Sequence, residues 1–373
     1  MIFKYLGFIA SDMKIAVLEP YIEGIGGAQR VIADYATFLA ERGHDLEIFT
    51  QRYNRDSAYP EFKKFKITLL KPSSKFFIPF IFLFKKFKGF DAIIANDWPS
   101  NFASIRNKKV LWICYTPKRD FYDLEEYYIK KDQGYKKRVF RKIKKIMFKG
   151  IDRLSAEKSD LISCASKNVS SRIKKYYGIN PEVINHGIFF NKYKQGKDKG
   201  YFLVASRFVA PKRVDLAIKA MGHVKNKKAK LIVVGDGEEK GKIIELCRKY
   251  KNVEFLGKVS DKKLVALYSN CRAIVYVPVN EDWGLAPIEA AASGKATIGA
   301  NEGGLRETIL DGKTGYLIDG VNEKKIAEKI DELAWNPWLA RKMGMEALKN
   351  SKKFDWNNLL PELEEELIKI SGK

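Results

Sequence analysis

The chain has 373 residues, 46% of them hydrophobic and 13% aromatic, which is too long for one ordinary core and sufficient for two without disulfides. Its three histidines and four scattered cysteines, with no C-x-x-C pair, argue against a histidine metal site, a histidine-based catalytic triad and a zinc site, and indicate a reducing compartment. The net charge of +24 fits nucleic acid, an anionic membrane or phosphorylated substrates as partners.

Short apolar runs alternate with helical stretches, which predicts parallel sheets covered by helices on both faces. The predicted strands are Lys14–Leu18, Asp45–Thr50, Phe65–Leu70, Ala92–Asn96, Val110–Cys114, Leu161–Ala165, Val183–Asn185, Tyr201–Ala205, Leu231–Val234, Val253–Leu256, Ala273–Val277 and Ala296–Ile298. Residues 1–12 precede the first strand, and a chain starting at Met13 is expected to fold and remain active.

This alternation predicts an α/β protein of two doubly wound, Rossmann-like domains that face each other across a cleft. The first domain is expected at 1–190 and the second at 191–355. A polar segment, Phe190–Lys199, reads as a flexible linker without structure, and a C-terminal helix at 356–373 is expected to pack back on the first domain.

Chemistry-bearing residues follow several of these strands. Gly26 and Gly27 open a helix after the first strand, which allows a phosphate to approach the backbone, although a plain tight turn fits them equally well. Arg207 and Lys212 flank a turn after the strand Tyr201–Ala205 and suit a diphosphate, with two solvated loop cations as the alternative. Gly235 supplies another tight turn at a strand end.

Two carboxylates bracket the segment Glu281-Asp-Trp-Gly-Leu-Ala-Pro-Ile-Glu289 after the strand Ala273–Val277. Ligands of open α/β sheets bind at such strand ends. One glutamate can hold a polyol at the mouth of the site, and the other, two helical turns later, a second hydroxyl. The intervening Gly284, Leu285 and Ala286 leave backbone N–H groups for a phosphate or sugar oxygen.

Together these segments resemble the GT-B glycosyltransferases of family 4. The resemblance rests on Gly26-Gly-Ala-Gln-Arg30, Ser206-Arg-x4-Lys-Arg213, Val233-Val-Gly-Asp-Gly237, Phe255-Leu-Gly-Lys-Val-Ser-Asp261, Glu281-x7-Glu289 and Gly303-Gly-Leu-Arg-Glu307 through Gly315, in order from Lys14 to about Trp356. It implies a retaining transferase that moves a sugar from a nucleoside diphosphate to an acceptor hydroxyl and requires no metal or other cofactor.

The resemblance also implies roles for individual residues. Arg207 and Lys212 would neutralise the leaving diphosphate, and Gly26 and Gly27 would bring backbone N–H groups to the same phosphates. Glu281 would hold the transferred sugar beside the amides of Gly284, Leu285 and Ala286. The remaining donor contacts would come from Glu289 to the ribose, from Val259 to the nucleobase, and from Gly235.

One segment departs from the family pattern. Trp112-Ile-Cys-Tyr-Thr-Pro-Lys-Arg119 resembles the family's His-Thr-Pro-x-Arg segment, with Tyr115 in place of the histidine. A phenol can still hydrogen-bond to a substrate, although a buried tyrosine at a strand end fits as well. Lys118 and Arg119 are placed to meet an acceptor phosphate. The Thr-Pro-x-Arg residues make mannose from a guanosine diphosphate donor the first guess, ahead of uridine-linked hexoses.

Two basic-aromatic segments bear on location. A basic amphipathic helix such as Lys136–Lys149 can lie on anionic lipid, but we expect its apolar face (Val139, Phe140, Ile143, Ile146 and Met147) to pack on the sheet instead. For Lys75–Lys88 we expect membrane contact through the exposed members among Phe80, Phe82, Phe84 and Phe87. No run reaches the roughly 18 to 20 apolar residues of a membrane span. The enzyme is therefore expected in the cytoplasm, peripherally on the inner face of the membrane.

Other function classes predict different features. A nucleic-acid-binding protein would carry a recognition module, and none is recognisable here. A GT-B phosphorylase would need a longer chain. A GT-B sugar-nucleotide epimerase would release free sugar without an acceptor, and is the main alternative to transfer onto a glycan or lipid-linked saccharide.

Overall fold

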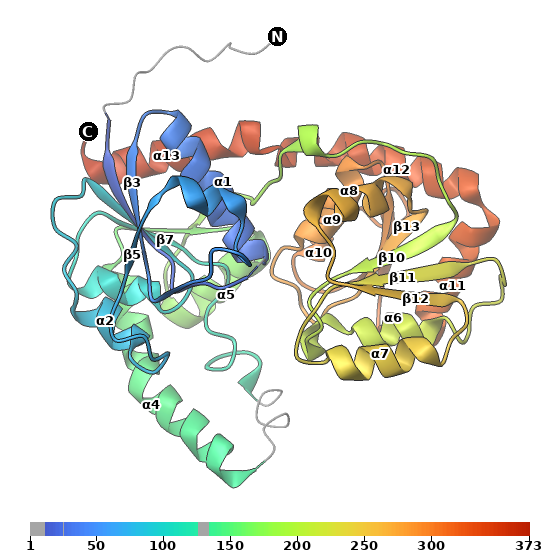
Figure 1. The fold of residues 1–373 in the computed structure, drawn as a ribbon, viewed down its shortest axis with the longest axis horizontal. Helices are drawn as coiled ribbons and strands as arrows, with labels where there is room; N and C mark the ends of the chain where they lie inside the picture. The colour runs from blue at the N-terminus through green and yellow to red at the C-terminus, as the bar shows by residue number, and fades with distance from the viewer. Residues whose placement is uncertain (1–11, 25, 126–133) are drawn as a thin grey trace. The chain divides into compact units, whose positions relative to one another are not determined.

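The chain folds into two compact units, each built on its own sheet (Figure 1). The computed structural model describes residues 12–24, 26–125 and 134–373. The first unit comprises the chain up to Asn185 together with Leu360–Lys373, and the second comprises His186–Leu359. The second unit therefore begins before residue 191, the position given by the sequence.

The first unit contains a seven-stranded sheet in the order β5-β3-β1-β6-β7-β8-β9, with every pairing parallel. Its strands are β1 Lys14–Leu18, β3 Asp45–Thr50, β5 Lys66–Leu69, β6 Ala92–Asn96, β7 Val110–Ile113, β8 Leu161–Cys164 and β9 Glu182–Val183. Its helices are α1 Gly27–Glu41, α2 Ile78–Phe84, α4 Tyr135–Lys158 and α5 Lys167–Tyr177, with 3-10 turns η1 Pro60–Lys64 and η2 Ser100–Ile105. A separate two-stranded pair joins β2 Tyr21–Ile22 to β4 Arg52–Tyr53.

The second unit contains a six-stranded parallel sheet in the order β12-β11-β10-β13-β14-β15. Its strands are β10 Tyr201–Ala205, β11 Lys230–Val234, β12 Val253–Gly257, β13 Ala273–Tyr276, β14 Ala296–Ala300 and β15 Gly315–Ile318. Its helices are α6 Val214–Ala220, α7 Lys240–Arg248, α8 Asp261–Asn270, α9 Leu285–Ala292, α10 Leu305–Thr308, α11 Glu323–Trp335 and α12 Pro337–Ser351, with turns η3 Phe190–Lys192, η4 Ala210–Lys212 and η5 Lys352–Phe354. The last helix is α13, Trp356–Ser371, and from Leu360 onward it belongs to the first unit.

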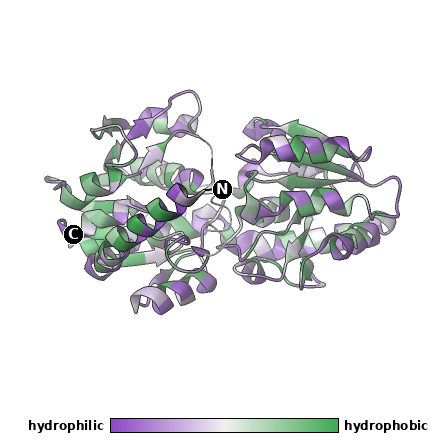
Figure 2. Cartoon of the chain, turned by 90° about the horizontal axis from the view of Figure 1, so that it is seen from below, coloured by the Kyte–Doolittle hydropathy of each residue, from purple (hydrophilic) through white to green (hydrophobic). Residues whose placement is uncertain are grey.

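The strands form because their apolar residues are buried on both faces of each sheet. In β1, Ile15 to Leu18 are fully buried, and in β13 all four residues are buried. Figure 2 shows the strands coloured mainly hydrophobic, while the surrounding helices carry both colours, as helices that cover a sheet require. The α/β class and the doubly wound parallel sheets predicted from the sequence are confirmed.

The strand predictions failed where the signal was short. The prediction Val183–Asn185 was misplaced, because the strand there is β9, Glu182–Val183. The strand β15 was missed because its four residues directly follow a turn. The pair β2 and β4 has two residues in each strand, too few to show a period.

The segment Phe190–Lys199 is not a structureless linker, contrary to the sequence prediction. Two of its backbone N–H groups donate to the last two residues of α8: Gly196 N–H to the Ser269 carbonyl and Lys199 N–H to the Asn270 carbonyl, both at 3.0 Å. Asp198 also pairs with Arg272 at 2.9 Å. These contacts fix the segment to the second unit.

The Phe-rich segment divides between core and surface. Phe82 and Phe87 are buried, so of the four phenylalanines named above only Phe84 is exposed, with Phe80 half-buried. The exposed rings also include Phe76 and Phe77. The helix α2 thus needs a single buried face, and other phenylalanines of the segment remain on the surface.

The prediction for Lys136–Lys149 was wrong. The apolar side chains expected on the sheet are largely exposed: Phe140, Ile143, Ile146 and Met147 all lie on the surface of α4. The helix instead turns Phe148 and Asp152 toward the unit. Within the described ranges, no helix is long and apolar enough to cross a membrane.

Candidate active site

The strand order of the second unit creates a switch point between β10 and β13. These neighbouring parallel strands are followed by connections that lead to opposite sides of the sheet, and ligands of doubly wound sheets bind outside the strand ends at such a point. Arg207 and Lys212 follow β10, and Glu281 follows β13. The topology therefore brings two sequence-predicted groups, Lys212 and Glu281, into direct contact.

Lys212 and Glu281 form an ion pair. Lys212 Nζ lies 2.8 and 2.7 Å from the two carboxylate oxygens of Glu281, and 3.0 Å from the Tyr276 hydroxyl at the end of β13. The two side chains are only 17% and 13% exposed. Burial lowers the pKa of Lys212, but the negative charge of Glu281 outweighs it and holds this pKa above its ordinary value. Lys212 therefore stays charged and can neutralise an anion.

Glu302 fixes the two turns that carry this pair. Its carboxylate accepts from Arg213 Nη1 and from the backbone N–H of Asn280, both at 2.8 Å. Arg213 and Asn280 each adopt a left-handed conformation, with φ of 48° and 40°, which is strained for a residue with a side chain. Glu302 was not among the predicted site residues, because nothing in the sequence links it to positions so far away in the chain.

The turn Gly303–Gly304 packs directly against the backbone of Glu281. A Cβ atom at Gly303 would lie 2.2 Å from the Glu281 carbonyl oxygen, and Gly304 N–H donates to that oxygen at 2.7 Å. Only glycine allows this approach. The turn thus positions the Glu281 backbone.

Arg207 lies in the turn after β10 and its side chain is exposed. Gly235, with φ of 146°, lies in the turn after β11 and packs against the backbone of Ser206, because a Cβ atom at this position would lie 1.8 Å from the Ser206 carbonyl oxygen. Unlike Lys212, Arg207 is engaged in no ion pair within the described part of the chain. The structure does not bring its side chain into the pair of Lys212 and Glu281.

Glu289 lies inside α9, and its carboxylate accepts hydrogen bonds from two tyrosines. Tyr193 donates to Oε1 at 3.1 Å and Tyr268 donates to Oε2 at 2.8 Å. Gly284 is the N-cap of α9, with φ of 88° and no side-chain cap, so the amides of Leu285 and Ala286 lie in an uncapped first turn. Val259 is half-buried in the loop between β12 and α8. Tyr193 was missed because it falls in the segment assigned as a linker.

The first unit has its own switch point, between β1 and β6. Glu19 after β1 accepts a short hydrogen bond from Asn96 at the end of β6, and the Tyr115 hydroxyl lies 2.9 Å from Asn96 Oδ1 and 3.1 Å from the Ala28 carbonyl oxygen. Burial raises the pKa of Glu19 to about 8, against the hydrogen bond from Asn96, which lowers it. The network is therefore held by a protonated carboxyl group at neutral pH.

This network fixes the start of α1. Gly26 is the extended N-cap residue without a side-chain cap, and Gly27 begins the helix with its surface exposed. A Cβ atom at Gly26 would lie 2.5 Å from Gln29 Oε1, and Gln29 in turn bonds to Glu19. Tyr115 is thus tied to the protein backbone beside the glycines, and burial holds its pKa well above the ordinary value.

Lys118 and Arg119 each lie beside an acidic group. Lys118 is 3.7 Å from Asp120 and its ammonium lies over the Trp98 ring, while Arg119 pairs with Asp123 at 2.9 Å. Both remain half-buried. An acceptor phosphate would have to share these cations with the carboxylates. Across the residues that the structure describes, no cluster of histidine, cysteine, aspartate or glutamate could hold a metal ion.

Two family descriptions match the chain and together cover both units. The glycosyltransferase family 4 description matches residues 25–190, and the description of glycosyl transferases group 1 matches residues 186–350. The chain is a family 4 glycosyltransferase with the GT-B fold. The resemblance drawn from the sequence motifs is therefore confirmed.

Curated relatives of this glycosyltransferase extend across most of the chain. The α-1,3/1,6-mannosyltransferase ALG2 of Dictyostelium discoideum is 24% identical over 90% of this chain and 92% of its own length, and human ALG2 is 22% identical over 89% and 90%. The uncharacterized glycosyltransferase MJ1178 of Methanocaldococcus jannaschii is 30% identical over 53% of this chain and 56% of its own.

Solved structures share the fold of this glycosyltransferase. A crystal structure of Anabaena HepE in complex with UDP and glucose has a TM-score of 0.75 at 17% identity, covering 95% of this chain and 99% of that one. Sucrose-phosphate synthase from Thermosynechococcus elongatus has a TM-score of 0.77 at 19% identity, covering 95% and 98%.

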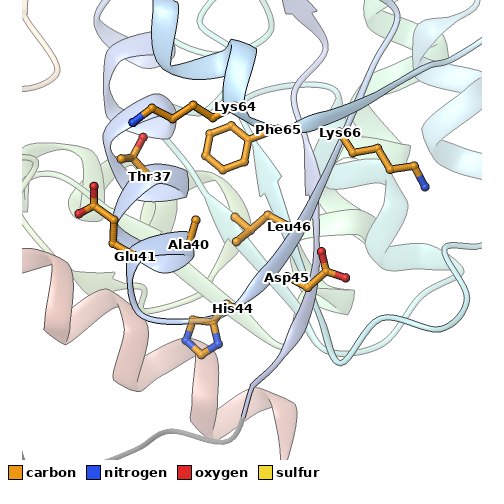
Figure 3. Close-up of a pocket in the computed structure, with 9 residues that line it drawn as sticks. All are labelled: Thr37, Ala40, Glu41, His44, Asp45, Leu46, Lys64, Phe65 and Lys66. Carbon is orange, nitrogen blue, oxygen red and sulfur yellow. The ribbon is translucent and has the colours of Figure 1, made fainter.

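A surface pocket of about 390 Å³ lies away from these groups of the glycosyltransferase (Figure 3). It is lined by the end of α1, the start of β3 and the turn before β5, including Glu41, Asp45 and Lys66. These are the amino ends of the strands, opposite the edge that carries Glu19 and Asn96. The pocket is not the place where a doubly wound sheet binds its ligand.

Proposed function

We propose that this enzyme transfers a hexose, with retention of configuration, from a nucleoside diphosphate sugar to a hydroxyl of a glycan or lipid-linked saccharide. The observation that carries the donor class is the meeting of Lys212 and Glu281 at the β10–β13 switch point, with Arg207 on the turn between β10 and Lys212. Cations suit a diphosphate and a carboxylate suits sugar hydroxyls. The complex of HepE with UDP and glucose, a protein of the same fold, supports this donor class.

The proposed chemistry is substitution on one face of the sugar. The bond from the anomeric carbon to the diphosphate oxygen breaks, the bond to the acceptor oxygen forms, and the acceptor proton passes to the departing diphosphate. Arg207 and Lys212 stabilise the charge that develops on this leaving group. Glu281 holds hydroxyls of the sugar, and Glu289 takes the ribose while Tyr193 and Tyr268 keep its carboxylate oriented.

Three further donor contacts belong to this proposal. The backbone of Gly26 and Gly27 contacts the phosphates, the amides of Gly284, Leu285 and Ala286 contact the sugar or phosphate, and the Val259 backbone contacts the base, with Gly235 shaping the turn beside Arg207. No metal ion takes part, because the cations supply the compensating charge. Tyr115, Lys118 and Arg119 belong to the acceptor side.

For the sugar we infer mannose from a guanosine diphosphate donor. The Thr-Pro-x-Arg residues and the ALG2 relatives, which are named as mannosyltransferases, support this choice over uridine-linked hexoses. A sugar-nucleotide epimerase is not favoured by the relatives, whose names are those of glycosyltransferases and sugar-transferring synthases.

The deciding experiment incubates the enzyme with radiolabelled GDP-mannose, UDP-glucose and UDP-N-acetylglucosamine, each with and without a lipid extract. Transfer of label to a lipid or glycan product, with retained anomeric configuration, is the expected result. Release of free sugar of altered configuration, independent of extract, would establish the epimerase instead. Arg207→Ala should lower transfer by about a hundredfold or more, since one lost contact to the developing charge has that effect elsewhere.

We further propose that the enzyme acts in the cytoplasm, bound peripherally to the inner face of the membrane. Support comes from the net charge of +24 and from the exposed rings of Phe76, Phe77 and Phe84. Sedimentation of the full chain with anionic vesicles tests this, and a protein that remains in the supernatant at low salt would contradict it.

A further inference from the structure

The helix α4 has two faces with different environments. One face is fixed to the first unit: Phe148 contacts the rings of Phe80 and Phe102 at centroid distances of 5.4 and 6.0 Å, and Asn101 donates to Asp152 and to Ser155 at 3.2 and 2.6 Å. These contacts come from the C-terminal half of the helix. In Figure 1 the N-terminal half extends away from the sheet.

The other face carries a stripe of exposed apolar side chains. We define the α4 stripe as Phe140, Ile143, Ile146, Met147 and Leu154, which are 58%, 50%, 81%, 43% and 41% exposed. Their spacings of three, four and seven residues place them along one side of a helix. Such a continuous row differs from the single apolar residues found on every protein surface.

The cations of α4 are divided between its two faces. On the inner side Arg141 pairs with Asp120 at 3.3 Å, Lys145 pairs with Glu125, and Lys144 lies 4.9 Å from the Trp98 ring centroid. Lys142, Lys149 and Arg153 are exposed, and of these Lys149 lies 5.2 Å from the Tyr122 ring centroid while Arg153 pairs with Glu157 at 3.2 Å. Because Ile146 lies four residues after Lys142 and three before Lys149, these cations border the stripe.

We propose that the α4 stripe is the surface by which this glycosyltransferase lies on an anionic lipid leaflet. This inference rests on the peripheral membrane association proposed above and names the element responsible. An amphipathic helix with an apolar side and bordering cations binds the interface plane, with apolar residues about 5 to 10 Å deep and each nearby cation adding attraction to anionic headgroups.

Charge favours lipid over a second copy of the chain. Two copies that met through this stripe would bring their bordering cations together, on a protein that already carries a net charge of +24. An anionic leaflet neutralises the same cations. The helix has 24 residues, so its axis is about 36 Å long and can lie along the surface.

The experiment compares full-length variants in co-sedimentation with vesicles of phosphatidylcholine and phosphatidylglycerol. The stripe variant, Phe140→Ser with Ile146→Ser, replaces two residues of the α4 stripe and no buried residue. Leu69→Ser with Trp338→Ser is the matched control, since these side chains are also largely exposed. A third variant changes Phe76, Phe77 and Phe84 to Ser. Hydrolysis of the soluble donor and circular dichroism show that each variant is folded.

We expect the stripe variant to lose about tenfold or more in vesicle partitioning, because each side chain gives up its burial in lipid. The control should bind like the wild type, and Lys142→Gln with Lys149→Gln should weaken binding at low salt more than at high salt. If the wild type binds vesicles and the stripe variant binds them equally well, the assignment to α4 is wrong. The assignment is also wrong if only the variant of Phe76, Phe77 and Phe84 loses vesicle binding. A wild-type protein that fails to bind would instead overturn membrane association itself. A stripe variant that changes a dimer into a monomer in light scattering without vesicles would assign the stripe to a second copy.

Discussion

The ion pair between Lys212 and Glu281 makes a prediction that separates stability from activity. Replacing Lys212 with Met leaves the Glu281 carboxylate largely buried without its nearest cation. Loss of one partner of a buried pair costs about 3 to 5 kcal/mol. Because these side chains retain 17% and 13% exposure, we expect the low end, about 3 kcal/mol in the free energy of unfolding.

A double variant measures the coupling energy between Lys212 and Glu281. Glu281→Gln with Lys212→Met removes both charges, so we expect it to be more stable than the sum of the single changes implies, by about 2 kcal/mol of coupling. Sugar transfer should nevertheless be lost in both single variants and in the double variant, because the proposed function gives Lys212 and Glu281 separate roles toward the donor. Urea unfolding followed by circular dichroism gives the first quantity, and initial rates with saturating nucleotide sugar give the second.

The exposed pair Lys240–Asp236 supplies the control. Its side chains are 47% and 48% exposed, so Lys240→Met should change the free energy of unfolding by at most about 0.5 kcal/mol. Single changes at Lys212 and Glu281 that are small and additive within about 0.5 kcal/mol would show that the pair does not form in solution. A double variant with normal turnover would refute the catalytic assignment of both residues.

Four other predictions follow from named contacts. Tyr193→Phe removes the donor to Glu289 Oε1 and should raise the KM for the nucleotide sugar about two- to tenfold at unchanged kcat, whereas an unchanged KM would place Glu289 outside the donor site. Glu19→Gln should raise the free energy of unfolding at pH 8 by on the order of 2 to 4 kcal/mol and have little effect at pH 4.5. The reason is that the pKa of Glu19 is about 8 in the folded state, so its ionisation disfavours the folded state as the pH rises. An equal effect at the two pH values would contradict a protonated Glu19. Burial lowers the pKa of His186 to about 3, so as the pH falls below about 6.5 the unfolded chain takes up a proton at this residue and the folded chain does not. Between pH 6.5 and 5 the free energy of unfolding of the wild type should therefore fall by about 1.6 kcal/mol more than that of His186→Gln in denaturant titrations. Transfer should survive EDTA, since the proposed function assigns the compensating charge to Arg207 and Lys212 rather than to a metal ion. Loss of activity with EDTA and its rescue by Mg²⁺ or Mn²⁺ would disprove this.

The strands could be predicted because burial on both faces leaves an unmistakable apolar run, as in Ile15 to Leu18 of β1. The motif residues after β10 and β13 could be predicted for the same reason, since a recognised strand places the residues that follow it. The partners of these residues could not. Glu302 and Tyr193 meet Arg213 and Glu289 through chain separations that no local pattern reveals.

The helix α4 shows a different limit. Its sequence is amphipathic whether the apolar side faces a sheet or the surface, so the pattern in Phe140, Ile143 and Ile146 fits both placements. The polar contacts of Asn101 with Asp152 and Ser155 decide the rotation of the helix about its axis. Such buried polar partners are invisible to a hydrophobic period.

The bonding of the segment Phe190–Lys199 has a consequence for protein engineering. A chimaera of two related glycosyltransferases exchanges one of the two units, and the polar segment between the units is the obvious place for the junction. Here a junction at the end of the segment, after Lys199, would take Tyr193 and Asp198 from one parent and their partners Glu289 and Arg272 from the other. A chimaera that keeps the second unit intact should instead be joined at Asn185, with a second junction inside α13 near Leu360, where the chain passes back to the first unit.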